Sequence, residues 1–157
     1  MAARSSTRSS RPALSRADSF AASSADALML IGRVLVGGMF LESGWGKLMN
    51  MAGSIGYLNS VKVPSPEIMV WLVLAVEIVV GVALIAGLAT RYAALLGAIF
   101  VIVATALAHR YWEYSGAAAN ANHLYFMKNV AILGGLLYIF VAGAGRFALD
   151  AKWARKR

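Results

Sequence analysis

Four long apolar segments, separated by short polar connections, make up most of the chain. They cover residues 28–49, 67–88, 92–108 and 124–144. A helix needs about 20 residues to cross the ~30 Å hydrocarbon core of a bilayer, and each segment is close to that length. Inside hydrocarbon every backbone polar group needs an internal partner, so the segments should be helical. The pattern predicts an all-α membrane protein, built as a four-transmembrane-helix bundle.

Turn-forming residues mark the boundaries of these segments. Pro64 and Pro66 precede the second segment, and residues 87–91 form a short turn before the third. The polar run 115–122 separates the third from the fourth, and Gly143 follows the last apolar turn. Proline and glycine are typical of helix starts and ends. We therefore expect three connections between consecutive membrane helices.

The two ends of the chain differ in composition from its centre. Residues 1–26 are rich in serine, alanine and arginine, which predicts a disordered basic tail. The same composition resembles an organellar presequence, which stays open as an alternative. Residues 27–150 form the expected membrane domain, and residues 151–157 form a basic tail after it.

Composition and charge support a membrane location. Hydrophobic residues make up 60% of the chain and charged residues 14%, with a net charge of +8. Ten basic residues lie in the two tails and the turn at Arg91, whereas Lys62 and Arg110 lie on the other side. Basic residues accumulate on the cytoplasmic side of membrane proteins, which predicts that both termini are cytoplasmic. Basic clusters beside apolar spans indicate contacts with anionic lipid rather than with nucleic acid.

The first apolar segment carries three ionisable side chains. Arg33 and Lys47 recur with Gly37, Phe40 and Gly44 at helical spacing, so all five share one face. Such a face, with small residues and buried charges, should point into the bundle. Glu42 projects to the opposite side of the same helix and therefore needs a separate explanation.

Glu77 is the candidate partner for the charges of the first segment. It lies eleven residues after Pro66, near the bilayer midplane at ~1.5 Å per residue, and Arg33 lies roughly 9 Å deep. We expect Arg33 and Glu77 to pair. Gly81, on the same face as Glu77, leaves room for a ligand. Two interpretations stay open: a structural lock between the two spans, and a carboxylate that handles protons or polarises a ligand.

The fourth segment adds Lys128 and Asn129 to the intramembrane polar candidates. Lys128 has two alternatives, a contact with Glu42 at similar depth or an extended side chain that reaches the membrane surface. Small residues that recur at helical spacing predict close contacts between helices. These candidates for helix packing are Gly37, Gly44, Gly81, Gly87 and Gly135.

Side-chain chemistry excludes several classes of site. The chain has no cysteine, so it cannot bind an iron–sulfur cluster or form disulfides. We expect no metal site. His109 and His123 are the only histidines, and no other feature supports haem ligation by them. No nucleotide-binding loop, zinc-binding spacing or nucleophile elbow is present.

The order of these motifs resembles the DoxX family of small bacterial inner-membrane proteins. The resemblance covers about residues 28–150 and departs from the family pattern at Ala144 and Ala148, where the family favours proline and serine. It rests on the row from Arg33 to Lys47, on Glu77, Gly81, Leu84, Gly87 and Arg91, and on the motif GAGRFALD at 143–150.

The resemblance implies a four-helix bundle in the inner membrane and a quinone- or redox-associated membrane subunit, at most one subunit of a quinone-linked oxidoreductase or of an oxidative-stress defence complex. The chain has no redox-active side-chain cluster, so electron transfer would require a bound quinone or a partner. Two alternatives stay open: a small-solute or proton transporter that uses Arg33 and Glu77, and a scaffolding subunit. The implied partners are the lipid bilayer and either redox-enzyme subunits or further copies of this chain.

Overall fold

The computed structural model describes residues 15–154, and these form an all-helical fold. In chain order the helices are α1 (Arg16–Met49), α2 (Met51–Ser60), α3 (Pro66–Ala86), α4 (Thr90–Ala108), the short 3-10 helix η1 (Tyr111–Glu113), α5 (Gly116–Ala142) and α6 (Leu149–Ala154). No strand occurs between residues 15 and 154. Helices α1, α3, α4 together with η1, and α5 are long and apolar enough to cross a membrane. The predicted fold class is confirmed.

Helix α1 begins well before the apolar segment that predicts it. Ser15 and Asp18 form a capping box, in which each backbone N–H donates to the other residue's side-chain oxygen at 3.1 Å. This arrangement satisfies two amide groups that have no partner within the helix. Residues 16–26, expected to belong to a disordered tail, are therefore helical in the structure. Residues 1–14 of that tail lie outside the described residues.

Helices also occupy segments that the sequence pattern predicts to be connections between helices. Asn50 ends α1 and starts α2, because its side-chain oxygen accepts a hydrogen bond from the Gly53 N–H at 3.1 Å. Helix α5 begins at Gly116, so most of the polar run 115–122 forms its first two turns. The alanines in that run have the highest helix propensity, which outweighs the turn character of the neighbouring asparagines.

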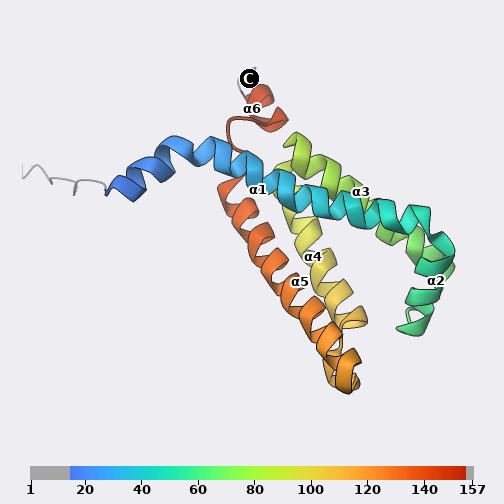
Figure 1. Ribbon diagram of the computed structural model, residues 1–157. Helices are drawn as coiled ribbons and strands as arrows, with labels where there is room; N and C mark the ends of the chain where they lie inside the picture. The colour runs from blue at the N-terminus through green and yellow to red at the C-terminus, as the bar shows by residue number, and fades with distance from the viewer. Residues whose placement is uncertain (1–14, 155–157) are drawn as a thin grey trace, which may run out of the picture.

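The membrane helices pack as two pairs, α1 with α3 and α4 with α5. The pairs meet at the end of the bundle near α6 and diverge towards the other end (Figure 1). Phe40, Leu84, Ala94 and Leu136 form part of the core where they meet, one residue from each membrane helix. Many large apolar side chains elsewhere point outward, as expected for helices surrounded by lipid.

The backbones of α1 and α3 touch at two glycines. A Cβ on Gly37 would lie 2.8 Å from the carbonyl oxygen of Gly81, and a Cβ on Gly81 would lie 2.8 Å from that of Gly37. Small residues permit this approach. Because the helices are antiparallel, the contact sets their register: residues one turn before Gly37 lie beside residues one turn after Gly81. Gly135 has only an ordinary contact, 3.8 Å to Val36 Cγ2.

Candidate functional site

Arg33 is fully buried, but its partners are backbone carbonyls of α3 and the carboxy-terminal segment. Its Nη1 donates to the oxygens of Leu84 at 2.7 Å and Ile85 at 3.3 Å, and its Nη2 donates to that of Phe147 at 2.7 Å. A cation there also faces the negative end of the α3 dipole. The prediction that Arg33 pairs with Glu77 is wrong. The Gly37–Gly81 contact places Arg33 beside the end of α3, about two turns from Glu77.

Asp150 completes this junction from the other side. Its carboxylate accepts hydrogen bonds from the N–H groups of Ala89 at 2.8 Å and Thr90 at 2.9 Å, which start α4. Its own N–H donates to the Gly87 carbonyl at 2.9 Å. Burial by itself would raise the pKa of Asp150, but the Thr90 and Ala89 amides outweigh it and lower the pKa below its ordinary value of 3.8. Segment 143–150 therefore forms hydrogen bonds at both the end of α3 and the start of α4 and holds these two helix ends together.

Gly87 is required in this junction. Its φ of +67° is left-handed, and a Cβ there would lie 2.5 Å from both Arg33 Nη1 and Ala148 Cβ. A side chain would be strained in its backbone and would collide with both neighbours. Ala148, one of the two positions that depart from the family pattern, is buried against this glycine. Packing and hydrogen bonding at this junction therefore account for the presence of Arg33, Gly87 and Asp150 in this chain.

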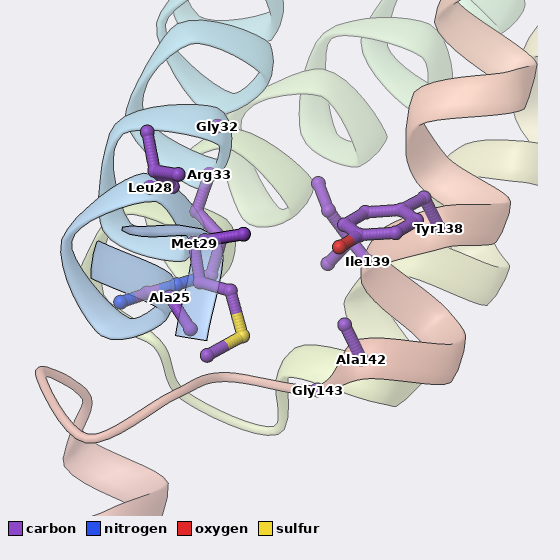
Figure 2. A pocket seen from close by; sticks show the side chains of 10 residues that line it. Ala25, Leu28, Met29, Gly32, Arg33, Tyr138, Ile139, Ala142 and Gly143 are labelled. Carbon is purple, nitrogen blue, oxygen red and sulfur yellow. The ribbon is translucent and has the colours of Figure 1, made fainter. Parts of the chain in front are cut away.

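A groove of about 200 Å³ lies between α1 and α5, close to this junction (Figure 2). Its α1 wall includes Met29, Gly32 and Arg33, and its α5 wall includes Tyr138 and Ala142. Most of the lining atoms are apolar. The Tyr138 ring extends across the groove, with its hydroxyl directed towards α1 (Figure 2).

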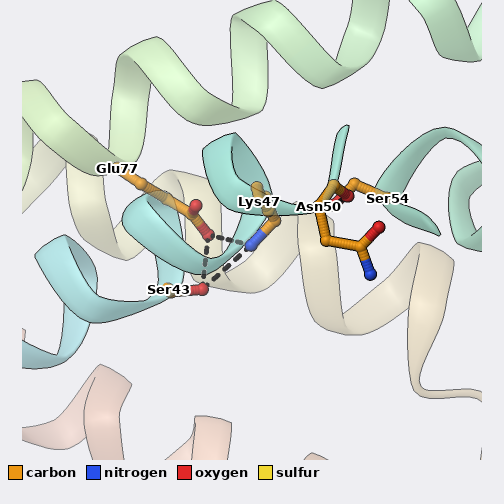
Figure 3. Close-up of polar contacts among 5 residues, drawn as sticks. All are labelled: Ser43, Lys47, Asn50, Ser54 and Glu77. Atoms are coloured by element: carbon orange, nitrogen blue, oxygen red, sulfur yellow. Dashed lines mark hydrogen bonds and ion pairs between the residues drawn. The ribbon is translucent and has the colours of Figure 1, made fainter. Parts of the chain in front are cut away.

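The charged partner of Glu77 is Lys47, which lies about four turns along α1 from the expected Arg33. Lys47 Nζ donates to Glu77 Oε1 at 2.9 Å, and the Ser43 hydroxyl donates to the same oxygen at 3.0 Å. Lys47 Nζ and Ser43 Oγ lie 2.9 Å apart, so the three groups close a triangle between α1 and α3 (Figure 3). We call Ser43, Lys47 and Glu77 the carboxylate cluster.

The second carboxylate oxygen of Glu77 has no hydrogen-bond partner among residues 15–154. Glu77 is 4% exposed, and its Oε2 is buried without a hydrogen bond from any described residue. A carboxylate can accept about four hydrogen bonds, and most buried polar atoms have at least one. An unsatisfied buried acceptor costs about 1–3 kcal/mol. The carboxylate cluster therefore keeps one strong acceptor without a hydrogen bond from the described residues, buried between α1 and α3.

Glycines bring the two helices together at the cluster but leave no room beside Gly81. A Cβ on Gly44 would lie 3.4 Å from Glu77 Cβ, so the missing side chain allows α3 to approach. The space beside Gly81, expected to admit a ligand, is filled by the Gly37 carbonyl and by the Leu41 side chain, which lies 2.7 Å from where a Gly81 Cβ would be. The accessible edge of the cluster is instead Lys47, whose side chain is 27% exposed.

Polar residues extend from the cluster towards the end of α1. Ser43, Lys47, Asn50 and Ser54 follow one another at spacings of four, three and four residues, and the last two flank the start of α2 (Figure 3). Asn50 and Ser54 are linked by a bond from the Ser54 hydroxyl to the Asn50 carbonyl at 2.9 Å. Sequence reasoning missed Ser43 as a site residue, although its position one turn before Lys47 is the signal that would have identified it.

The other candidate side chains do not join the cluster. Glu42 is exposed and has no polar contact with a described residue, and Lys128 is exposed with its Nζ 4.9 Å from the Tyr125 ring centroid. The alternative contact between Lys128 and Glu42 therefore does not occur. Asn129 donates to the Thr105 hydroxyl at 2.9 Å and links α5 to α4. Thr105 is a further polar residue that sequence reasoning missed.

The two histidines occupy separate aromatic contacts rather than a common site. His109 lies 5.4 Å from the Tyr125 ring centroid and His123 lies 4.8 Å from that of Tyr111. Within residues 15–154, no group of three or more histidine, aspartate or glutamate side chains could hold a metal ion.

Comparison with known proteins agrees with the motifs and the fold. The sequence model of the DoxX family matches residues 28–110. Inner membrane protein YqjF of Escherichia coli K12 is 35% identical over 125 residues, which cover 80% of this chain and 91% of that protein. Inner membrane protein YphA of the same organism is 30% identical over 125 residues, covering 80% and 89%. No solved structure matches the chain. The chain belongs to the DoxX family and is a multi-pass inner-membrane protein.

Proposed function

We propose that this protein is a quinone-associated membrane subunit of a redox complex, in which the carboxylate cluster binds the polar head of the quinone and holds a proton for it. Lys47 supplies the accessible donor, and Glu77 supplies the buried acceptor. Ser43 orients the carboxylate through its bond to Oε1. In this proposal the electrons come from a partner subunit, because this chain has no cysteine and its described residues contain no group of three or more side chains that could hold a metal ion.

The free oxygen of Glu77 is the observation that carries this proposal. In a purely structural ion pair, both carboxylate oxygens would be expected to have partners, since each unsatisfied buried acceptor destabilises the fold. Here Oε1 accepts both hydrogen bonds, and Oε2 accepts none from the part of the chain that the structure describes. Intramembrane ionisable groups that are kept at such a cost are typical of ligand and proton sites.

The donor set fits a quinone head. A quinone supplies carbonyl oxygens that accept hydrogen bonds and that take up protons when it is reduced. Lys47 Nζ has one donor beyond the two used by Glu77 and Ser43, because an ammonium group carries three. Its partial exposure lets it meet a ligand that arrives through the lipid, and Glu77 Oε2 then receives or returns a proton.

Quinone retention tests the proposal directly. The full-length protein, extracted from native membranes in mild detergent, is expected to carry bound quinone that solvent extraction and chromatography can quantify. Glu77→Gln preserves the shape and one acceptor but removes the charge that orients Lys47, so retention should fall several-fold. Glu42→Gln is the matched control, because Glu42 lies on α1 one residue from Ser43 and contacts no described polar group. Equal retention in all three proteins would contradict the proposal.

Proton or small-solute transport is a second candidate, supported by a different observation. The polar row Ser43, Lys47, Asn50 and Ser54 leads from Glu77 towards the end of the bundle that α2 covers. Proteoliposomes with an imposed pH gradient and an internal pH-sensitive dye would measure proton flux through the wild-type protein. Flux that is abolished by Glu77→Gln and unchanged by Glu42→Gln would favour transport over quinone binding.

A further inference from the structure

The groove between α1 and α5 lies along the first turns of α1 and the last turns of α5, two helices long and apolar enough to cross a membrane. Its volume of about 200 Å³ exceeds the ~150 Å³ that holds a benzene-sized apolar ligand in a protein interior. Ala25, Leu28 and Met29 of α1 and Ala142 of α5 supply much of the apolar lining. Two polar side chains belong to the lining, Arg33 and Tyr138. The Arg33 guanidinium is used by carbonyls of α3 and of the segment before α6, whereas the Tyr138 hydroxyl is directed across the groove and forms no hydrogen bond with a described residue (Figure 2).

The Arg91 guanidinium and the backbone of Arg146 lie near the end of the groove, where α5 finishes. Gly143 lines the groove, and the Arg91 guanidinium lies 3.2 Å from where its Cβ would be. Arg91 uses one donor for the Phe140 carbonyl at 3.1 Å and is otherwise exposed. Arg146 is also exposed, and its backbone N–H binds Asp26 Oδ1 at 2.8 Å. The Arg146 guanidinium lies 5.9 Å from the Phe147 ring centroid. Neither guanidinium forms an ion pair with a described acid, so both are available to an anion.

We propose that this groove is a binding site for one anionic phospholipid. One acyl chain lies between α1 and α5, the Tyr138 hydroxyl donates to an ester oxygen, and Arg91 and Arg146 contact the phosphate. Tyr138 precedes Gly143 by five residues on α5, so an ester beside Tyr138 and a phosphate beside Arg91 would follow one another towards the end of this helix. The site lies about two turns of α1 or more from the carboxylate cluster and does not depend on its function.

Charge distinguishes this occupant from the others that an apolar groove could take. A quinone tail carries no anion for the two arginines. A second copy of this chain would bring the same arginines to the same face, and each chain already has a net charge of +8. A basic residue close to an anionic lipid contributes about 1 kcal/mol, which is about fivefold in affinity for each arginine.

Native mass spectrometry of the full-length protein in detergent tests the site, with dioleoyl phosphatidylglycerol and dioleoyl phosphatidylcholine titrated separately. The wild-type protein should bind one phosphatidylglycerol more tightly than phosphatidylcholine. Arg91→Gln and Arg146→Gln should each reduce that preference about fivefold. Gly32→Leu should weaken the binding of both lipids about tenfold, because the new side chain displaces roughly two methylene groups of the acyl chain.

Gly32→Leu has a matched control on the same helix. An added Cβ meets no heavy atom within 4 Å at Gly32 or at Gly38, so both substitutions should fold, but only Gly32 lines the groove. Gly38→Leu should bind both lipids as the wild type does. Equal wild-type affinity for the two lipids, or equal effects of the two glycine substitutions, would overturn the proposal. So would a Gly32→Leu protein that loses ubiquinone but keeps phosphatidylglycerol.

Discussion

Lys47 Nζ and Glu77 Oε1 lie 2.9 Å apart and join α1 to α3 inside the membrane domain. The lysine is partly exposed and the glutamate is buried, with one oxygen free. Arg33, which shares its α1 face with Lys47, instead binds the end of α3 and the segment before α6. The two cations on one helix face therefore have different roles. Arg33 holds the bundle together at one end, and Lys47 belongs to the candidate site.

The first prediction concerns coupling within the ion pair. Glu77→Leu or Lys47→Met alone leaves the other charge without its partner, which costs about 3 kcal/mol, the low end for buried pairs because Lys47 is partly exposed. The double variant should recover most of that loss. Urea or thermal unfolding in detergent gives the four free energies of the cycle. Glu42→Leu and Lys128→Met, which are not in contact, should show no coupling, and additive losses for Lys47 and Glu77 would exclude the pair.

The second prediction concerns Arg33. Arg33→Met removes three hydrogen bonds to carbonyls of Leu84, Ile85 and Phe147. Charged hydrogen bonds contribute about 1.5–3 kcal/mol each, so amide hydrogen exchange should accelerate at residues 84–90 and 147–150. Arg33→Lys should not restore protection, because an ammonium group lacks the planar fork that reaches two segments. Lys128→Met, at an exposed cation of α5 away from this junction, is the control, and equal exchange in both variants would contradict the assigned role.

The third prediction is a dependence of stability on pH through Asp150. Its pKa is lower in the folded protein than the ordinary 3.8, so its contribution is present above that value and disappears as the pH falls through the folded pKa. Asp150→Asn should therefore be less stable than the wild type at pH 7, and the two should converge below pH 3.8. Unfolding in detergent across this range measures the difference. The exposed Glu67→Gln serves as control, and a pH-independent gap for Asp150→Asn would contradict the assignment.

Much of the fold follows from the sequence because the bilayer imposes a length and a hydrophobicity on each span. Those two quantities predict the four membrane helices. The row from Arg33 to Lys47 does point into the bundle, with Gly37 and Gly44 against α3 and Phe40 in the common core. The additional turns of α1 escape such a prediction because the Ser15–Asp18 capping box outweighs a polar composition. Helix α2 depends on the Asn50 side chain, which a composition-based reading cannot weigh.

The partners of the buried charges cannot be predicted in the same way. Reasoning from the sequence estimates the depth of a residue in the membrane separately for each helix. By depth alone, Arg33 and Glu77 are close enough to pair. Their relative position depends on the register of α1 against α3, which the Gly37–Gly81 backbone contact sets. That contact is a property of the packed pair. Once it is known, Lys47 and Ser43 are the residues of α1 that reach Glu77.

The fourth prediction concerns orientation, which the charge distribution assigns with both termini in the cytoplasm. Because the chain has no cysteine, single cysteines can be introduced without background. Cysteines at Ser60 and Ser115 should react with an impermeant thiol reagent in intact cells, and one at Ala154 should react only after permeabilisation. The reverse pattern would place the termini outside.

The quinone content of the Lys47→Met/Glu77→Leu protein, purified from native membranes, tests the central claim most directly. Well-packed apolar side chains can replace a buried ion pair without loss of stability, so this variant should fold. If the carboxylate cluster is a ligand and proton site, the variant unfolds with wild-type stability but loses its quinone, since no apolar group replaces the donor and acceptor. A stable double variant that retains the wild-type amount of quinone would contradict the account and leave Lys47 and Glu77 with a structural role alone.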